Sequence, residues 1–169
     1  MKTDLSPLIH KLIEALRQEL QEYGEMLALL NRQQAAVVER AADDVLQSVT
    51  FINEQLPRIQ AARQQRESCQ NELAQALGRA GEGAFSKLVP LLPEKFRAAL
   101  EILVRENNQL LLRIQNRTRQ NHLLLTRSLQ LMQEFMQALM PPSGPTTYNG
   151  EGQVQPAALA PQRFYEAVG

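Results

Sequence analysis

From Glu94 to Met140 the sequence contains neither glycine nor proline, although the chain holds 8 glycines and 9 prolines in its 169 residues. These two residues interrupt helices most strongly, so the stretch can form one continuous helix. At 1.5 Å per residue such a helix would be roughly 70 Å long. Shorter helices of the same chain could not cover all of it. We therefore expect part of its apolar surface to be open or to be covered by another molecule.

Glycine and proline elsewhere divide the chain into a body and a tail. They are dense from Pro141 onward, and three glycines in 78–83 predict a flexible link. We expect a helical domain over 1–140 and a disordered tail over 141–169. The expected helices span about 6–40, 43–77 and 93–140, with a helical turn or two in 84–92. Pro57 lies inside the second helix and predicts a kink there.

The apolar residues of the first expected helix recur at alternating spacings of four and three. They are Ile9, Ile13, Leu16, Leu20, Tyr23, Leu27 and Leu30. This heptad pattern predicts a helix that packs along a coiled-coil-like seam. Ser6 is predicted to cap its start, with Pro7 as the first helical residue, and Asp43 or Asp44 is predicted to cap the second helix.

The other two helices have less regular patterns. The apolar set of the second is Val45, Val49, Ile52, Leu56 and Ile59, followed by Ala62, Cys69, Leu73 and Leu77. In the third helix, Asn107, Arg117 and Asn121 fall near core positions. The sequence predicts an all-α fold, an elongated antiparallel helical hairpin or three-helix coiled-coil-like bundle with one very long C-terminal helix.

Composition excludes several classes of function. The 18 basic residues balance the 18 acidic ones, which argues against bulk attraction to nucleic acid or anionic membranes. A single cysteine cannot form an internal disulfide. The apolar runs are too short for a membrane span, and the N-terminus does not resemble a signal peptide. We expect a cytoplasmic protein.

Residues that could carry chemistry are few and scattered. His10 and His122 lie on different expected helices without further ligands at suitable spacing. Cys69 has no histidine near it in sequence, and Gly78, Gly81 and Gly83 lack the rest of a phosphate-binding motif. We expect no catalytic residues, no cofactor and no metal, and therefore no enzyme.

Two stretches of the third helix stand out. A locally basic one holds Arg105, Arg113, Arg117, Arg119 and Arg127 with one acidic residue, Glu106; a solvated face or a contact with an acidic protein partner would explain it. The other, 129–140, holds three of the five methionines beside Phe135. Methionine suits surfaces that accept amphipathic helices. The predicted partner-binding residues are Leu124, Leu125, Leu131, Met132, Phe135, Met136 and Leu139; packing against the first helix would account for them equally well.

The order of these features resembles the FlgN-type flagellar export chaperones over roughly residues 5 to 152. The matching residues are Leu16, Glu19, Leu20, Tyr23, Leu27 and Leu30, then 59–66 leading to Leu77 and Gly78, then Asn121, Leu124, Leu125, Leu131, Phe135 and Leu139, and finally Tyr148 and Gly152. The resemblance implies a cytoplasmic chaperone without catalysis. Its partners would be hook–filament junction proteins, bound by the C-terminal helix and delivered to the flagellar type III export gate.

Two other classes remain open from the residues alone. The regular first seam favours a structural coiled-coil scaffold that pairs with copies of itself, including a homodimer. The arginines of the third helix would suit a nucleic-acid-associated protein, but no aromatic stacking residues or known module accompany them.

Overall fold

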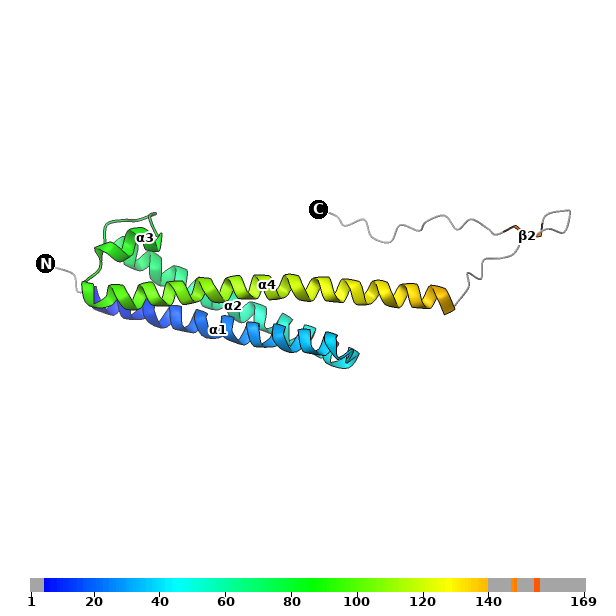
Figure 1. Cartoon of the computed structure of the whole chain (residues 1–169). Coiled ribbons are helices and arrows are strands. Elements are labelled where there is room, and N and C mark those ends of the chain that lie inside the picture. Colours follow the sequence, from blue (N-terminus) through cyan, green and yellow to red (C-terminus); the bar gives the residue numbers. More distant parts are fainter. Residues whose placement is uncertain (1–4, 140–146, 149–153, 156–169) are drawn as a thin grey trace. The chain divides into compact units, whose positions relative to one another are not determined.

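The computed structural model describes residues 5–139, 147–148 and 154–155 (Figure 1). Its helices are α1 (Ser6–Val38), α2 (Ala42–Ala76), α3 (Phe85–Leu88), the 3-10 helix η1 (Val89–Leu91) and α4 (Glu94–Leu139). The chain divides into two units, residues 1–125 and residues 126–169, and α4 contributes to both. The prediction of an all-α fold with one very long C-terminal helix is confirmed.

The helix starts differ slightly from those predicted. Ser6 is the first residue of α1 and Leu5 occupies the cap position, so the predicted serine cap is wrong by one residue. Ala41 occupies the cap position of α2, and Asp43 and Asp44 lie in its first turn. There their carboxylates favour the helix start through the positive end of the helix dipole instead of through a capping bond.

The connection between α1 and α2 is a tight turn at Arg40, whose φ of 58° lies in the left-handed region. The amide of Ala41 donates to the carbonyl of Ala36 over 2.9 Å, and the amide of Arg40 donates to that of Val37 over 3.2 Å. This pair of bonds is the Schellman pattern that ends many helices. It reverses the chain so that α2 returns along α1.

α1 and α2 are antiparallel, because their paired residues rise on one helix as they fall on the other. Gln55 bonds to Glu22, Arg66 to Glu19, and Lys11 lies 3.9 Å from Glu72. The row of α2 that faces α1 recurs every seven residues and consists of small or polar side chains. It comprises Ser48, Gln55, Ala62 and Cys69, all of them buried.

The first part of the apolar set predicted for α2 is therefore not its main packing row, whereas Ala62, Cys69 and Leu73 of the same set are buried. Val49 is 41% exposed and Leu56 is 52% exposed, while Val45, Ile52 and Ile59 are half-buried. Small residues let two helices approach closely, which explains why the neighbouring row is the one buried. α2 continues through Pro57, which is exposed. The kink remains a prediction.

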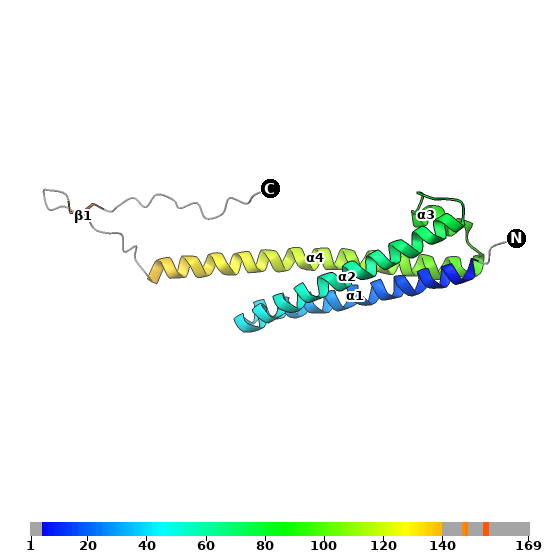
Figure 2. The same ribbon diagram turned by 180° about the vertical axis from the view of Figure 1, so that it is seen from behind.

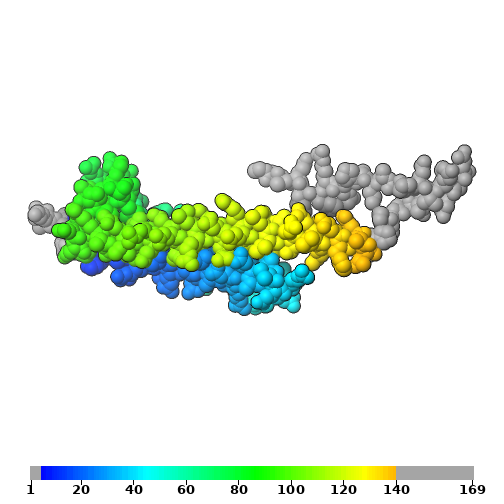
Figure 3. Space-filling view, in the orientation of Figure 1, coloured from blue at the N-terminus to red at the C-terminus, as the bar shows by residue number. Residues whose placement is uncertain are grey.

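An apolar core lies where α3 and η1 meet the first turns of α1 and α4 and the last turns of α2. Its members are Ile9, Leu12, Ile13, Ala15, Leu16, Cys69, Leu73, Val89, Leu92, Phe96 and Leu100. Figure 3 shows α3 standing out beside the first part of α4. The helical turns predicted for 84–92 are thus confirmed, and they cover one end of the first unit.

Within the first unit α4 runs parallel to α1 (Figure 2). The side-chain amide of Asn107 donates to the carbonyl of Leu16 over 3.1 Å, and that of Asn121 donates to the carbonyl of Leu30 over 2.8 Å. From the first bond to the second, the residue number rises by 14, or two heptads, on both α1 and α4. The two helices are therefore parallel and in a fixed register. Of the three residues predicted near core positions, Asn107 and Asn121 are buried and Arg117 is half-buried.

In the second unit the described residues are the end of α4 and two short strands. β1 (Thr147–Tyr148) pairs antiparallel with β2 (Val154–Gln155), with Thr147 opposite Gln155 and Tyr148 opposite Val154. The disordered tail predicted for 141–169 otherwise lies outside the described residues, so that prediction is not tested.

Candidate partner-binding surface

The end of α4 exposes its large apolar side chains. Every residue from Thr126 to Leu139 is exposed. The terminal stripe, as we name its apolar residues, consists of Leu129 (60% exposed), Leu131 (54%), Met132 (61%), Phe135 (63%), Met136 (54%) and Leu139 (65%). Six large apolar side chains this exposed on about three turns of helix are unusual for a surface that meets water alone.

Helical geometry puts the terminal stripe on one face. Its members form two interleaved rows, 129–132–136–139 and 131–135–139, whose spacings of three and four bring side chains to the same side of an α-helix. The other face carries Arg127, Gln130, Gln133, Glu134 and Gln137. This segment is therefore amphipathic by itself, with flexible methionine and leucine side chains around one phenylalanine.

The seven residues predicted to bind a partner fall into two groups. Leu131, Met132, Phe135, Met136 and Leu139 all belong to the terminal stripe. Leu124 and Leu125 are half-buried and belong to the first unit. Leu129 was not among the predicted residues, although its spacing to Met132 and Met136 is the signal that identifies it. That these residues bind a partner remains a prediction.

The basic stretch of α4 is mostly unpaired. Arg117 donates to the side chain of Gln34 on α1. Arg105, Arg113, Arg119 and Arg127 form no ion pair with any residue in the described ranges. The four remain available to acidic groups of another molecule.

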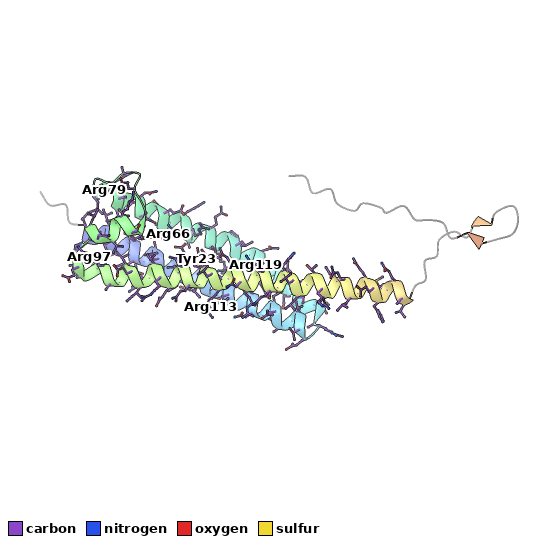
Figure 4. The ribbon with its side chains drawn as sticks, turned by 45° about the horizontal axis from the view of Figure 1, so that its top comes forward. Tyr23, Arg66, Arg79, Arg97, Arg113 and Arg119 are labelled. Carbon is purple, nitrogen blue, oxygen red and sulfur yellow. The ribbon has the colours of Figure 1, made fainter. Side chains whose placement is uncertain are left out.

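A buried ionic cluster joins α1 to α2 in the first unit (Figure 4). The Glu19 carboxylate accepts a bond from Arg66 Nε over 3.0 Å and from the Tyr23 hydroxyl over 2.9 Å. Arg66 also donates to Gln70 over 2.9 Å, and Gln70 donates to the carbonyl of Gly83. Because Glu19 is 4% exposed, its charge requires these partners.

This environment raises the pKa of Tyr23 to about 12. The main cause is burial of the phenol, followed by the negative charge of Glu19 and the hydrogen bond to it. Arg63 and Arg66 oppose the shift. The Tyr23 phenol is therefore uncharged at neutral pH, and its bonding to the paired Glu19 favours a structural role over proton transfer.

The amides that join α4 to α1 are incompletely bonded. Asn107 Nδ2 also donates to Leu103 over 3.0 Å, and Asn121 Nδ2 to the side chain of Gln33 over 3.0 Å. The Oδ1 atoms of both asparagines are buried and accept no hydrogen bond from the described part of the chain. Such acceptors lower stability, so the register of α4 is specified at an energetic cost.

The remaining candidates do not assemble into a site. His10 packs edge-on against Phe96 with ring centroids 5.2 Å apart, and Cys69 is buried in the core. Over residues 5–139 and the two strands, no three histidine, cysteine or acidic side chains gather as metal ligands would. The helices searched over the same residues include none with the length and apolarity of a membrane span.

Comparison with known proteins gives one match. The family model described as FlgN protein matches residues 1–156. That range contains α1 to α4 and both strands. No curated protein and no solved structure matches the chain significantly. The resemblance drawn from the order of the sequence features is confirmed.

Proposed function

We propose that this chain, which belongs to the FlgN family of flagellar export chaperones, binds hook–filament junction proteins through the terminal stripe. In this proposal it acts in the cytoplasm, keeps the apolar terminal helices of these clients from associating prematurely, and delivers them to the flagellar type III export gate. The observation that carries the proposal is the exposure of the stripe, from 54% at Leu131 and Met136 to 65% at Leu139.

The physical basis is burial of apolar surface between two amphipathic helices. A fully buried large side chain contributes roughly 1.5–3 kcal/mol, so a few of the six stripe residues would suffice for binding. Ordering a client segment costs several kcal/mol of that gain. The net affinity would then be moderate, and the client could leave at the gate without ATP-driven work by this chain.

The test is a titration of purified junction protein into the wild type and into Met132→Asp/Phe135→Asp. Removing two apolar anchors and placing two charges among the rest should weaken binding at least about 100-fold. The matched control is Gln133→Asp/Gln137→Asp, which adds the same charges on the opposite face and should change affinity less than about threefold. Equal affinities of the wild type and the stripe variant would contradict the proposal.

A self-associating scaffold has lost its main support. The regular seam of α1 favoured it, but Ile9, Leu16 and Tyr23 of that seam are buried within the chain. Sedimentation separates the two functions: we expect a monomer that forms a 1:1 complex with its client. A stable dimer that ignores the client would favour the scaffold.

A further inference from the structure

A cavity opens in the first unit between α1, α2 and α4. Its volume is about 390 Å³. Leu16 and Tyr23 of α1 line it, together with Arg63 and Arg66 of α2 and Asn107 and Leu111 of α4. A second cavity of about 420 Å³ between α3 and α4 shares Phe85, Val104 and Asn108 with it. We call the first cavity and the face of α2 that leads to it the α2–α4 crevice.

Two rows of α2 lead along this face, each with a period of seven residues. Val45, Ile52 and Ile59 are half-buried and continue to Arg66; Val49 and Leu56 are exposed and continue to Arg63. Both arginines line the cavity. Each apolar row of α2 therefore ends at a residue of the cavity. From Val49 to Arg63 the second row extends about 21 Å along the helix, the length of four helical turns.

The polar groups of the crevice determine which chemical groups a bound molecule must supply. Arg63 is exposed and forms no ion pair with any residue that the structure describes. The Glu19 carboxylate also lines the cavity, but it is already bound to Arg66. Asn107 is 6% exposed, and its Oδ1 accepts no hydrogen bond within the described ranges. A suitable occupant brings a carboxylate to Arg63, apolar side chains to Leu56 and Ile59, and an N–H or O–H donor toward Asn107.

We propose that the α2–α4 crevice binds an amphipathic helix of a partner protein whose polar face is acidic, as a fourth helix beside α1, α2 and α4. Two helices flanking a third form a trough that fits a cylinder, and four-helix packing buries such rows. This site is separate from the terminal stripe and does not depend on the function proposed for it. The terminal stripe of a second copy suits the crevice less well, because its polar face carries three glutamines, one arginine and one glutamate.

The probe is a fluorescent synthetic helix of leucine and glutamate with leucines at spacings of three and four, compared with the same peptide carrying lysine for glutamate. We expect the acidic peptide to bind the full chain at least about tenfold more tightly than the basic one. Leu56→Asp and Arg63→Glu should each weaken it at least about tenfold. Both side chains are exposed, so these variants should fold, which circular dichroism checks.

Two control variants separate this proposal from its alternatives. Arg58→Glu reverses another exposed charge of α2 away from both rows, and Phe135→Asp disrupts the terminal stripe; each should change affinity less than about threefold. Equal effects of Arg58→Glu and Arg63→Glu would mean nonspecific attraction and overturn the proposal. Loss of binding in Phe135→Asp, or equal binding of the acidic and basic peptides, would also overturn it. The same holds if the wild type binds neither peptide, or if the wild type is a dimer that Leu56→Asp dissociates.

Discussion

The two parts of α4 relate polarity to burial in opposite ways. Up to Asn121 the helix buries two asparagines along with Phe96 and Leu100. From Thr126 to Leu139 it exposes leucine, methionine and phenylalanine. The heptad position of Asn107 and Asn121 recurs at Phe135, so one spacing pattern serves both parts. A helix selected only for folding would place its apolar residues where they are buried.

This difference separates the residues of α4 that stabilise the fold from those that are exposed to other molecules. In the covered part, amide hydrogen bonds to the carbonyls of Leu16 and Leu30 set the register of α4. In the exposed part, nothing in the described ranges buries the terminal stripe. Substitutions in the first part should therefore change stability, and those in the second should change binding.

The strongest test of this difference replaces one apolar residue in each part. Leu100 is fully buried, so Leu100→Ala should lower the free energy of unfolding by about 2–5 kcal/mol through lost contacts and a cavity. Phe135 is 63% exposed, so Phe135→Ala should change it by less than about 0.5 kcal/mol. Urea unfolding followed by circular dichroism measures both. A comparable loss in Phe135→Ala would mean that the end of α4 is packed in the folded chain.

The buried row of a helix was predictable from the sequence where large apolar side chains form it, and less so where small or polar side chains do. All the predicted seam residues of α1 are buried except Leu20, which is half-buried. On the first half of α2 hydropathy favoured Val49 and Leu56 over the buried Ser48 and Gln55, while Ala62 and Cys69 farther along the same row were predicted. Which row of a helix faces the neighbouring helix depends on how closely the two backbones approach, and this distance is set by both helices together.

The sequence predicted where two buried polar side chains lie, but not which groups they bond to. The sequence put Asn107 and Asn121 near core positions, because they continue an apolar heptad. Their acceptors are backbone carbonyls of α1, far away in sequence. The Glu19–Arg66 pair was likewise not predictable, since antiparallel packing of α1 and α2 decides which charges meet. For the terminal stripe, apolar spacing identified five of the six residues, because within the described ranges no other part of the chain covers them.

Alkaline pH provides a second test, which acts on the covered region. The folded-state pKa of Tyr23 is about 12 against an ordinary value of 10.0, so the folded chain favours the neutral phenol. That contribution is complete below pH 10 and is lost as the pH rises to about 12, at about 2–3 kcal/mol in total. Unfolding free energies across this range, compared between the wild type and Tyr23→Phe, measure it. Parallel curves would mean that Tyr23 is not buried against Glu19.

The smallest expected effects concern the two asparagines, and they should differ from each other. Asn107 Nδ2 donates to two backbone carbonyls within helices, which keep their helical bonds if the side chain is removed. Asn107→Leu therefore removes an unpartnered buried acceptor without creating another. We expect the free energy of unfolding to rise by about 1 kcal/mol.

Asn121→Leu should stabilise less, or not at all, because it also removes the donor to Gln33, which is 6% exposed and would become an unpartnered buried group itself. Urea unfolding of the two single variants measures the difference. If Asn107→Leu lowers the free energy of unfolding below that of the wild type, the bonds of its Nδ2 contribute more than the unpartnered Oδ1 costs. The polar part of α4 would then be a source of stability, and the opposition between its two parts would rest on the terminal stripe alone.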